Sequence, residues 1–340
     1  MRADDTRPFT VLQSFPEPRE TTNPYVVMLR DALDRTPGAA VLTFSWRRAL
    51  TARYDAFHAH WPEILVDGNG PVKKLVRQAL FVLFLLRLRL TRVPLVRTVH
   101  NLELPEGLSR REVVLLRWAE RVTALRIRIN ETTELDGGTP VETIVHGHYR
   151  PWYSPHPRRE RCPGRLAFVG QVRRYKGVDR LVEAFGETTD AGLSLRVAGR
   201  PTSEELGDQL RAAAAADQRI GLSLTFLPDR DLVAEVSEAE LVVLPYREMH
   251  NSGGALAALS LDTPVLVPDN EVNRRLAEEV GPGWVHTFTP PLTGADLTGT
   301  LDRLRAAPPA APPDLSRREW DDAGRAHVEA YRRARATLRS

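Results

Sequence analysis

The sequence predicts an α/β protein made of two Rossmann-like domains. Short apolar runs rich in Val, Leu and Ile recur along the chain, and segments with helical spacing of apolar residues separate them. With 340 residues the chain is also longer than one hydrophobic core usually organises. Strands that alternate with helices form parallel sheets covered on both faces. We therefore expect two such sheets, one in each half.

Six strand-like runs are expected in each half, in an order that repeats the same scheme. Those of the first half are Thr10–Phe15, Ala40–Phe44, Tyr54–His58, Pro94–His100, Leu125–Ile129 and Glu142–Val145. Those of the second half are Arg165–Gly170, Leu193–Ala198, Leu222–Leu227, Glu240–Pro245, Pro264–Pro268 and Trp284–Phe288. The clearest helical patterns between them are Tyr25–Leu33, Arg110–Arg121, Asp179–Phe185, Ser203–Ala216 and Asp231–Glu238.

Two Pro-rich segments mark the expected boundaries. Residues 151–160 combine Pro with charge, as linkers do, and residues 306–313 alternate Pro with Ala. We expect an N-terminal domain over residues 1–155, a C-terminal domain over 156–315, and a charged helix over 316–340 that packs back towards the N-terminal domain through Trp320 and Tyr331.

Composition narrows the class of protein. The net charge of +3 is small for this length, so nothing calls for a nucleic-acid partner. A single cysteine, Cys162, excludes an intramolecular disulfide and fits a reducing compartment. The first residues lack the apolar core of a signal peptide, so a cytoplasmic location is expected.

The apolar run Ala79–Leu90 raises the question of a membrane. It is far shorter than the roughly 20 residues that span a bilayer, and Arg87 and Arg89 interrupt it. A buried helix under a sheet is the preferred interpretation. A helix that dips into the membrane is the alternative, which leaves peripheral contact at the inner face of the membrane open.

The segment Asn251-Ser252-Gly253-Gly254 follows the apolar run Leu241–Pro245 and opens an Ala/Leu helix. The first N–H groups of a helix have no internal partner, and the helix dipole is positive there. Glycines at such a junction let an anion approach the backbone closely. The pattern predicts a phosphate site, most simply for a nucleotide.

A second group of residues in the same half carries positive charge. Arg173, Arg174 and Lys176 follow the strand that ends at Gly170. Paired with the helix start at Ser252, they predict a cationic clamp on a diphosphate. A solvated basic loop is the alternative.

The tripeptide Asp229-Arg230-Asp231 spells D-x-D, a pattern that binds metal-bound nucleotides in some transferases. Here it begins a predicted helix, where Asp caps free N–H groups and suits the dipole. We prefer the capping role. No His/Cys cluster has zinc spacing, so no metal site is expected.

Several short strings recur in order along the two halves: His58–Glu63, Thr98–Asn101, His146–Tyr149, Phe168–Gln171, Tyr175–Val178, Asn251–Gly254 and Leu259–Val265. Through these strings and the two expected sheets, the chain resembles the GT-B class of glycosyltransferases, in which two Rossmann-like domains face each other across a cleft. The N-terminal strings are similar to those of bacterial exopolysaccharide and glycolipid enzymes of the mannosyltransferase type.

The resemblance implies a reaction and its participants. A sugar would pass from a nucleotide diphosphate donor, a GDP- or UDP-sugar, to a hydroxyl of a saccharide, glycolipid or small-molecule acceptor. The C-terminal domain would hold the donor through Gly170, Lys176 and the Asn251–Gly254 loop. No cofactor beyond the donor substrate, and no metal, would be required.

The sequence departs from the retaining members of this class. Retaining members carry two glutamates, eight positions apart, around the Ala/Leu helix that follows the Asn251–Gly254 loop. When this chain is aligned on Pro264-Val265, Met249 and Ala257 occupy the two glutamate positions. Glu248, one residue away, is the local substitute that we predict for the first glutamate. The glycine before Pro264-Val265 is Asp262, and the usual arginine after the first loop glycine is Gln171. The stereochemistry therefore stays open.

Candidates for the acceptor side follow the ends of predicted strands. His100 ends one strand, and it is either a general base or a structural histidine. Glu103, Glu106 and Glu63 are other possible bases, and the sequence does not rank them. Predicted substrate-binding residues are Asn23, His60, Glu63 and His146.

Two other functions fit the same fold. A protein without the paired glutamates could bind a nucleotide sugar without catalysis. Alternatively, it could epimerise a free nucleotide sugar. Hydrolysis of the donor would count against the first, and interconversion of two nucleotide sugars without an acceptor would identify the second.

Overall fold

The computed structural model describes residues 7–105, 107–135, 137–247 and 249–338. The chain forms two compact units. Unit 1 comprises Met1–Gly147 and Arg318–Ser340, and unit 2 comprises His148–Arg317. The division lies nearer to the N-terminus than residue 155, and the last helix belongs to unit 1. A Cβ atom on Gly147 would lie 2.4 Å from the Trp320 ring, so the end of the first segment packs directly against the returning chain.

Unit 1 is built on a six-stranded parallel sheet with the strand order β2-β1-β3-β4-β5-β6. Its strands are β1 (Phe9–Gln13), β2 (Ala39–Leu42), β3 (Ala56–Ala59), β4 (Leu95–Val99), β5 (Thr123–Arg128) and β6 (Val141–Thr143). Its helices are α1 (Pro24–Arg35), α2 (Trp46–Thr51), α3 (Glu63–Val66), α4 (Pro71–Leu90), α5 (Arg110–Arg121) and α13 (Trp320–Thr337).

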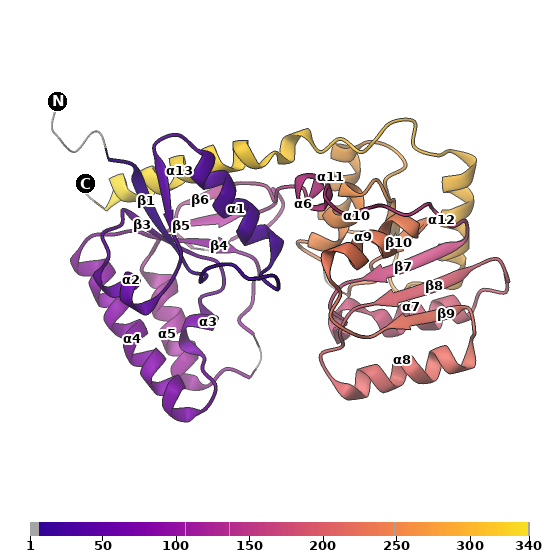
Figure 1. Cartoon of the computed structure of the whole chain (residues 1–340), viewed down its shortest axis with the longest axis horizontal. Helices are drawn as coiled ribbons and strands as arrows, with labels where there is room; N and C mark the ends of the chain where they lie inside the picture. The colour runs from indigo at the N-terminus through magenta and orange to yellow at the C-terminus, as the bar shows by residue number, and fades with distance from the viewer. Residues whose placement is uncertain (1–6, 106, 136, 248, 339–340) are drawn as a thin grey trace. The chain divides into compact units, whose positions relative to one another are not determined.

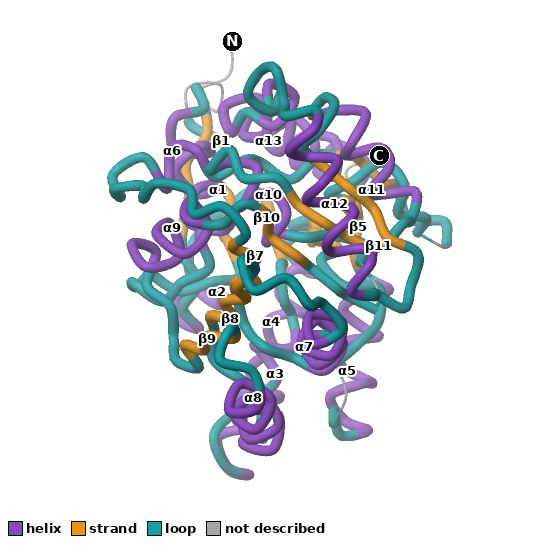
Figure 2. Tube along the Cα trace, turned by 90° about the vertical axis from the view of Figure 1, so that its right-hand side faces the viewer, coloured by secondary structure: helices purple, strands orange, loops and turns teal. Residues whose placement is uncertain are grey.

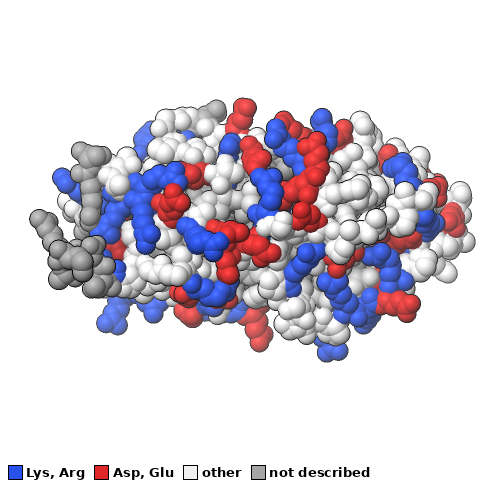
Figure 3. Space-filling model, turned by 90° about the horizontal axis from the view of Figure 1, so that it is seen from above, with Lys and Arg blue, Asp and Glu red and all other residues white. Residues whose placement is uncertain are grey.

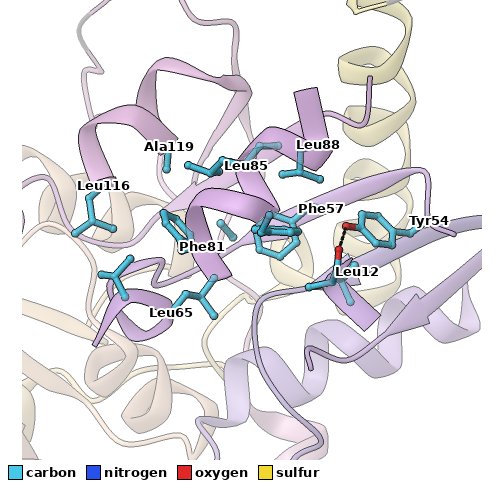
Figure 4. Close-up of a cluster of buried hydrophobic side chains, with 14 residues drawn as sticks. Leu12, Tyr54, Phe57, Leu65, Phe81, Leu85, Leu88, Leu116 and Ala119 are labelled. Atoms are coloured by element: carbon cyan, nitrogen blue, oxygen red, sulfur yellow. Dashed lines mark hydrogen bonds between the residues drawn. The ribbon is translucent and has the colours of Figure 1, made fainter. Parts of the chain in front are cut away.

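Side chains alternate between the two faces of this sheet, as strand geometry requires. On β3 and β4 the side chains of Phe57, Ala59 and Leu95 belong to an apolar cluster with helices α4 and α5. Figure 4 shows this cluster, with Phe81, Leu85 and Leu88 of α4 and Leu116 and Ala119 of α5 beside Phe57. The other face carries polar aromatic side chains, described below.

Helix α13 returns to unit 1 after the chain has passed through unit 2. It packs against α1 and contacts β4 and β5, and Figure 1 shows it in yellow beside the indigo α1. Trp320 and Tyr331 are both buried, and Arg335 pairs with the buried carboxylate of Asp55. Unit 1 is thus completed by residues from both ends of the sequence.

Unit 2 is built on a second six-stranded parallel sheet, with the order β12-β11-β10-β7-β8-β9. Its strands are β7 (Arg165–Val169), β8 (Ser194–Ala198), β9 (Ile220–Ser223), β10 (Leu241–Val243), β11 (Val265–Pro268) and β12 (Val285–Phe288), and Figure 2 shows β7, β8 and β9 side by side. Its helices are α6 (Arg150–Tyr153), η1 (Arg174–Lys176), α7 (Val178–Gly186), α8 (Glu204–Ala216), α9 (Asp229–Glu238), α10 (Gly253–Ser260), α11 (Glu271–Val280), α12 (Gly294–Ala306) and η2 (Ser316–Arg318).

The strand orders locate the place in each sheet where a ligand is expected. In unit 2 the order reverses between β7 and β10, and in unit 1 it reverses between β1 and β3. Loops that leave two such neighbouring strands diverge to opposite faces, so a crevice opens at the carboxyl ends between them. The predicted donor residues follow β7 and β10, and Asn23, His60 and Glu63 follow β1 and β3, whereas His100 and His146 follow β4 and β6.

The predicted fold is confirmed. Each of the twelve predicted runs overlaps a strand in the described residues, although most strands are shorter than the runs and several begin earlier, as β9 does at Ile220 instead of Leu222. The charged residues seen in Figure 3 are of both signs and interspersed, in line with the small net charge. Among the described residues no helix is long and apolar enough to cross a membrane. Helix α4 buries one face only.

Candidate functional site

Lys176 is the central charged residue at the carboxyl end of β7. Burial, and then the neighbouring Arg173, lower the pKa of its ammonium group to about 8. The ammonium lies 5.3 Å from the centre of the Tyr246 ring, and no carboxylate among the described residues pairs with it. Gly170 has φ of +124°, and a Cβ there would lie 3.7 Å from the Lys176 nitrogen. A half-buried cation without a counter-ion is a ready site for an anion.

Helix α10 begins beside the same residues. Ser252 is its N-cap, and the Ser252 hydroxyl accepts a hydrogen bond from the Ala255 amide at 3.1 Å. A Cβ on Gly254 would lie 3.4 Å from the Tyr246 hydroxyl oxygen, so Tyr246 links the helix start to Lys176. The strand order reverses between β7 and β10, and both features follow those strands. The structure therefore brings Gly170, Lys176, Ser252, Gly253 and Gly254 together.

The two arginines of the predicted clamp have side-chain partners of their own. Arg174 pairs with Glu205 of α8 at 2.7 Å, and both side chains are exposed. The Arg173 guanidinium donates to the uncharged Gln171 side chain at 2.9 Å and is close enough to Lys176 to lower its pKa. Lys176 is thus the half-buried cation of this loop, and Arg173 adds positive charge beside it.

The D-x-D residues lie in the first turn of α9 and not at its cap. The N-cap is Pro228, which makes no side-chain hydrogen bond, so the predicted capping role was wrong in detail. The Asp229 carboxylate accepts a hydrogen bond from the Trp152 indole at 2.9 Å. Two carboxylates in a first turn still suit the helix dipole. Within the described ranges no group of three His, Cys, Asp or Glu side chains could hold a metal ion.

The positions of the retaining-type glutamates are apolar and buried. Met249 and Ala257 are 5% and 7% exposed, and neither can replace a carboxylate. Asp262, in place of the usual glycine, has φ of +57°, and its carboxylate pairs with Arg158 at 2.7 Å. Glu248 lies outside the described residues, as does Glu106.

In unit 1 the face of the sheet opposite the apolar cluster carries a histidine cluster, which we define as His58, His60, His100, His146 and His327. Tyr25 of α1 packs at its centre. The Tyr25 ring centre lies 5.9 Å from that of His60, 5.1 Å from that of His100 and 4.7 Å from that of His146. Trp320 of α13 covers the other side of Tyr25 at 5.5 Å.

Hydrogen bonds fix the rings of this cluster. The His60 Nε2 lies 3.0 Å from the Gln13 Oε1, and its Nδ1 lies 3.2 Å from the His100 Nε2. With the Gln13 oxygen as acceptor, His60 donates from Nε2 and accepts from His100, so the His100 Nδ1 remains an acceptor. His58 lies 2.8 Å from the Thr98 hydroxyl and 2.7 Å from that of Tyr331.

The cluster is held in the uncharged form. Burial lowers the pKa of His100 to about 3 and those of His146 and His327 to about 4. Burial also lowers the pKa values of His58 and His60 well below the usual value. Because a general base works best with a pKa near the working pH, His100 is a weak base in this setting.

The other residues predicted for the acceptor side have distinct surroundings. Asn23 is the N-cap of α1, and its side chain accepts from the Tyr25 amide at 3.0 Å. His60 and His146 are buried, and His60 supports His100. Glu103 is exposed. Glu63 begins α3 and is half-buried, and burial raises the pKa of its carboxyl group.

The chain is similar to characterised transferases over nearly its whole length. It is 45% identical over 323 residues to a GDP-mannose:glycolipid 4-β-D-mannosyltransferase of Xanthomonas campestris pv. campestris, which covers 95% of this chain and 91% of that protein. Residues 163–296 match the family described as glycosyl transferases group 1.

The chain belongs to the GT-B glycosyltransferases.

Solved GT-B structures share the fold at low sequence identity. The catalytic domain of starch synthase IV from Arabidopsis thaliana, bound to ADP and acarbose, superposes with a TM-score of 0.66 at 10% identity, covering 97% of this chain and 100% of that one. The Anabaena HepE protein in complex with UDP-glucose gives 0.61 at 14% identity, covering 97% and 96%. The family places the chain among enzymes.

Sequence reasoning did not predict the roles of several residues that shape the candidate site of this glycosyltransferase, although it expected Tyr331 to dock the last helix. Gln13, Thr98 and Tyr331 fix the histidine rings, and Trp61 stacks on His100 at 4.3 Å. One signal was present for Gln13 and Thr98, because each is a polar residue within a buried apolar strand. For Tyr331 no local signal exists, because it is 273 residues from its partner His58.

Unit 1 should lose stability as the pH falls. A histidine whose folded-state pKa is lowered stays neutral until well below pH 6.5, whereas the unfolded chain takes up a proton there. The free energy of unfolding should therefore decrease below about pH 6.5 by up to about 1.4 kcal/mol per pH unit for each such histidine. Urea unfolding at pH 5 and pH 7.5 measures this difference.

His327→Leu provides the matched variant. The Nε2 of His327 is buried without a hydrogen-bond partner in the described structure, so leucine removes a titrating group at small packing cost. The pH dependence of stability should become shallower in this variant and stay unchanged in His156→Gln of unit 2. An equal slope in all three proteins would contradict the assignment.

Proposed function

We propose that this enzyme transfers mannose from GDP-mannose to a hydroxyl group of a glycolipid, with inversion at the anomeric carbon. The observation that carries the proposal is the 45% identity, over 95% of the chain, to a GDP-mannose:glycolipid 4-β-D-mannosyltransferase. GDP-mannose is an α-linked donor, so a β-linked product requires inversion. The buried Met249 and Ala257, where retaining enzymes carry glutamates, agree with this.

Inversion proceeds by direct displacement. The acceptor oxygen bonds to C1 of mannose on the side opposite the diphosphate. The bond from C1 to the diphosphate oxygen breaks, and its electron pair leaves with GDP. The hydroxyl proton passes to a base. Charge builds up on the diphosphate, and a cation with free helix N–H groups stabilises it.

Unit 2 is the proposed donor site. The Lys176 ammonium would contact the diphosphate, and the amides of Gly253 and Gly254 at the start of α10 would donate to it. Support comes from the absence of a carboxylate partner for Lys176 among the described residues and from the position of both features between β7 and β10. The Lys176 ammonium lies over the Tyr246 ring, and among the described residues this ring, and not an ion pair, orients it.

Lys176→Met should weaken GDP binding by about 10- to 150-fold, because a hydrogen bond to a charged group contributes about 1.5–3 kcal/mol. Calorimetry with GDP measures the dissociation constant. Arg174→Met is the matched control, since Arg174 already pairs with Glu205, and its affinity should match that of the unaltered enzyme.

The pH dependence sharpens this test. In the protein without a bound ligand the pKa of Lys176 is about 8. Above that pH its ammonium group loses its proton and its charge, so the affinity for GDP should fall. Lys176→Arg should keep its affinity up to pH 9, because arginine stays protonated. The same decline in both proteins would remove Lys176 from the donor site.

No divalent metal is expected to be needed. Lys176 and the α10 N-terminus would balance the diphosphate charge, and Asp229 is engaged by Trp152. Mannosyl transfer should therefore continue in EDTA at an unchanged rate. Loss of activity in EDTA that magnesium or manganese restores would assign Asp229 and Asp231 to a metal.

Unit 1 would supply the base. We assign this role to Glu63, since burial raises its pKa whereas that of His100 falls to about 3. His100 would orient the acceptor through its Nδ1, held by His60 and by the stacked Trp61. His100 directly follows β4, and Glu63 begins α3, the helix that comes shortly after the neighbouring strand β3.

Glu63→Gln should lower kcat by about 10²- to 10⁴-fold and leave GDP affinity unchanged, because general base catalysis contributes on that scale. In Glu63→Gln, the fall of kcat/KM towards acidic pH should also disappear, because the variant has no carboxyl group to protonate at this position. His100→Asn should mainly raise the KM for the acceptor. Glu103→Gln, at an exposed position, should keep the kcat and KM of the unaltered enzyme. A large loss of kcat in His100→Asn, with normal turnover in Glu63→Gln, would make His100 the base.

Helix α4 is the proposed contact with the membrane that holds the glycolipid. Its solvent side carries apolar side chains at helical spacing: Val72, Leu75, Val76, Leu83, Leu86 and Leu90. The helix contains no Asp or Glu, and Lys73, Arg77 and Arg89 are exposed on it. An apolar stripe beside basic residues is typical of helices that lie on anionic lipid surfaces.

The double substitution Leu83→Glu with Leu86→Glu should reduce binding to vesicles of anionic phospholipid at least tenfold. Binding to vesicles of neutral phospholipid should be weak already in the unaltered protein. Phe226→Glu, an equally exposed apolar position in unit 2, is the control. Sedimentation with vesicles measures binding to the anionic and to the neutral phospholipid. Equal binding of the unaltered protein and all variants would contradict a membrane contact through α4.

A further inference from the structure

An apolar cavity of about 220 Å³ lies within unit 1, between the sheet and helices α4 and α5. Phe57 and Ala59 of β3 line it, together with Phe81 of α4 and Leu116 and Ala119 of α5. Figure 4 shows all but Ala59 of these labelled in the apolar cluster. An apolar cavity of about 150 Å³ stays dry and can bind benzene. This one therefore has room for a short aliphatic segment.

The position of the cavity relates it to the proposed acceptor site. Ala59 and Pro62 line it on either side of His60 in the sequence, and Leu102 and Leu104 lie in the loop that follows His100. Because side chains alternate along a strand, the cavity and the histidine cluster lie on opposite faces of the same strand ends. A ligand that passes round the carboxyl ends of β3 and β4 could have its polar part near His100 and Glu63 and an attached chain in the cavity.

The rim of the cavity carries net positive charge. Arg97, Arg117 and Glu120 line it. Glu120 is shared by Arg97 and Arg126, and the buried Nε of Arg97 has no hydrogen-bond partner in the described structure. Arg117 is exposed and makes no ion pair among the described residues. Leu102, also at the rim, is 49% exposed. Apolar walls and a cationic rim suit an amphiphile with an anionic group beside its chain.

We propose that this cavity binds the first segment of the hydrocarbon chain of an anionic glycolipid acceptor, with the anionic group at Arg97 and Arg117. The inference rests on the proposed function, which supplies the glycolipid. It adds a subsite that selects the acceptor by its lipid and not by its sugar. The rest of the chain would remain in the membrane, where the exposed side of α4 would hold the enzyme.

Binding of decyl phosphate, below the concentration at which it forms micelles, tests the cavity directly. The unaltered protein should bind it, and Ala119→Phe, which fills the cavity, should raise the dissociation constant at least tenfold. Val114→Phe is the matched control, because Val114 is exposed on the same helix. Leu102→Asp is a second variant at an exposed position, where folding is not at risk, and it should also weaken binding. Equal affinity in all four proteins, or no binding by the unaltered one, would overturn the inference.

A kinetic comparison separates this inference from the proposed function. Ala119→Phe should raise the KM for a lipid-linked acceptor and leave unchanged the KM for the same saccharide without its lipid. If both KM values respond equally, the cavity does not hold the chain. If the unaltered enzyme uses neither acceptor with GDP-mannose, the proposed function fails, and decyl phosphate binding still tests the cavity.

Discussion

The alternation of side chains along parallel strands is the constraint on which the unit 1 site depends. On β3 and β4, one set of side chains builds the apolar layer under α4 and α5, and the other set builds the histidine cluster. A shift of one residue in either strand would exchange the two. Because all strands run in parallel, the loops that carry His60, Glu63 and His100 emerge at the same edge of the sheet. The two chemical environments are therefore separated by the thickness of one sheet.

The proposed donor site in unit 2 depends on a different balance, that of charge against burial. Lys176 is desolvated without a carboxylate in the described structure, and its lowered pKa reports that cost. Such an arrangement is unfavourable in the free protein and favourable once an anion arrives. Arg174 is neutralised by Glu205, whereas Arg173 donates to the uncharged Gln171 and adds to the positive potential at Lys176.

Burying the histidine cluster also costs free energy, which other interactions of the fold offset. Neutral, hydrogen-bonded imidazoles pack around Tyr25 and are closed off by Trp320 and Tyr331 of α13. These contacts hold the loop of His100 in place. They explain why the last helix of the chain belongs to unit 1: without it, the buried face of the cluster would be open to water.

The sequence by itself determined the two parallel sheets, the strand-to-helix junction at Ser252 and the basic loop that carries Lys176, because each follows from local periodicity and from residues close together in the chain. It also singled out His100 at the end of a predicted strand and His60 in the segment after another. Only the tertiary structure decided which side chains surround these residues. It directed Arg174 to Glu205, enclosed His60 between Gln13 and His100, and brought Tyr331 to His58. These outcomes depend on contacts between residues far apart in the sequence, and on burial, which sets the pKa of Glu63 and His100 and has no signature in local residue spacing.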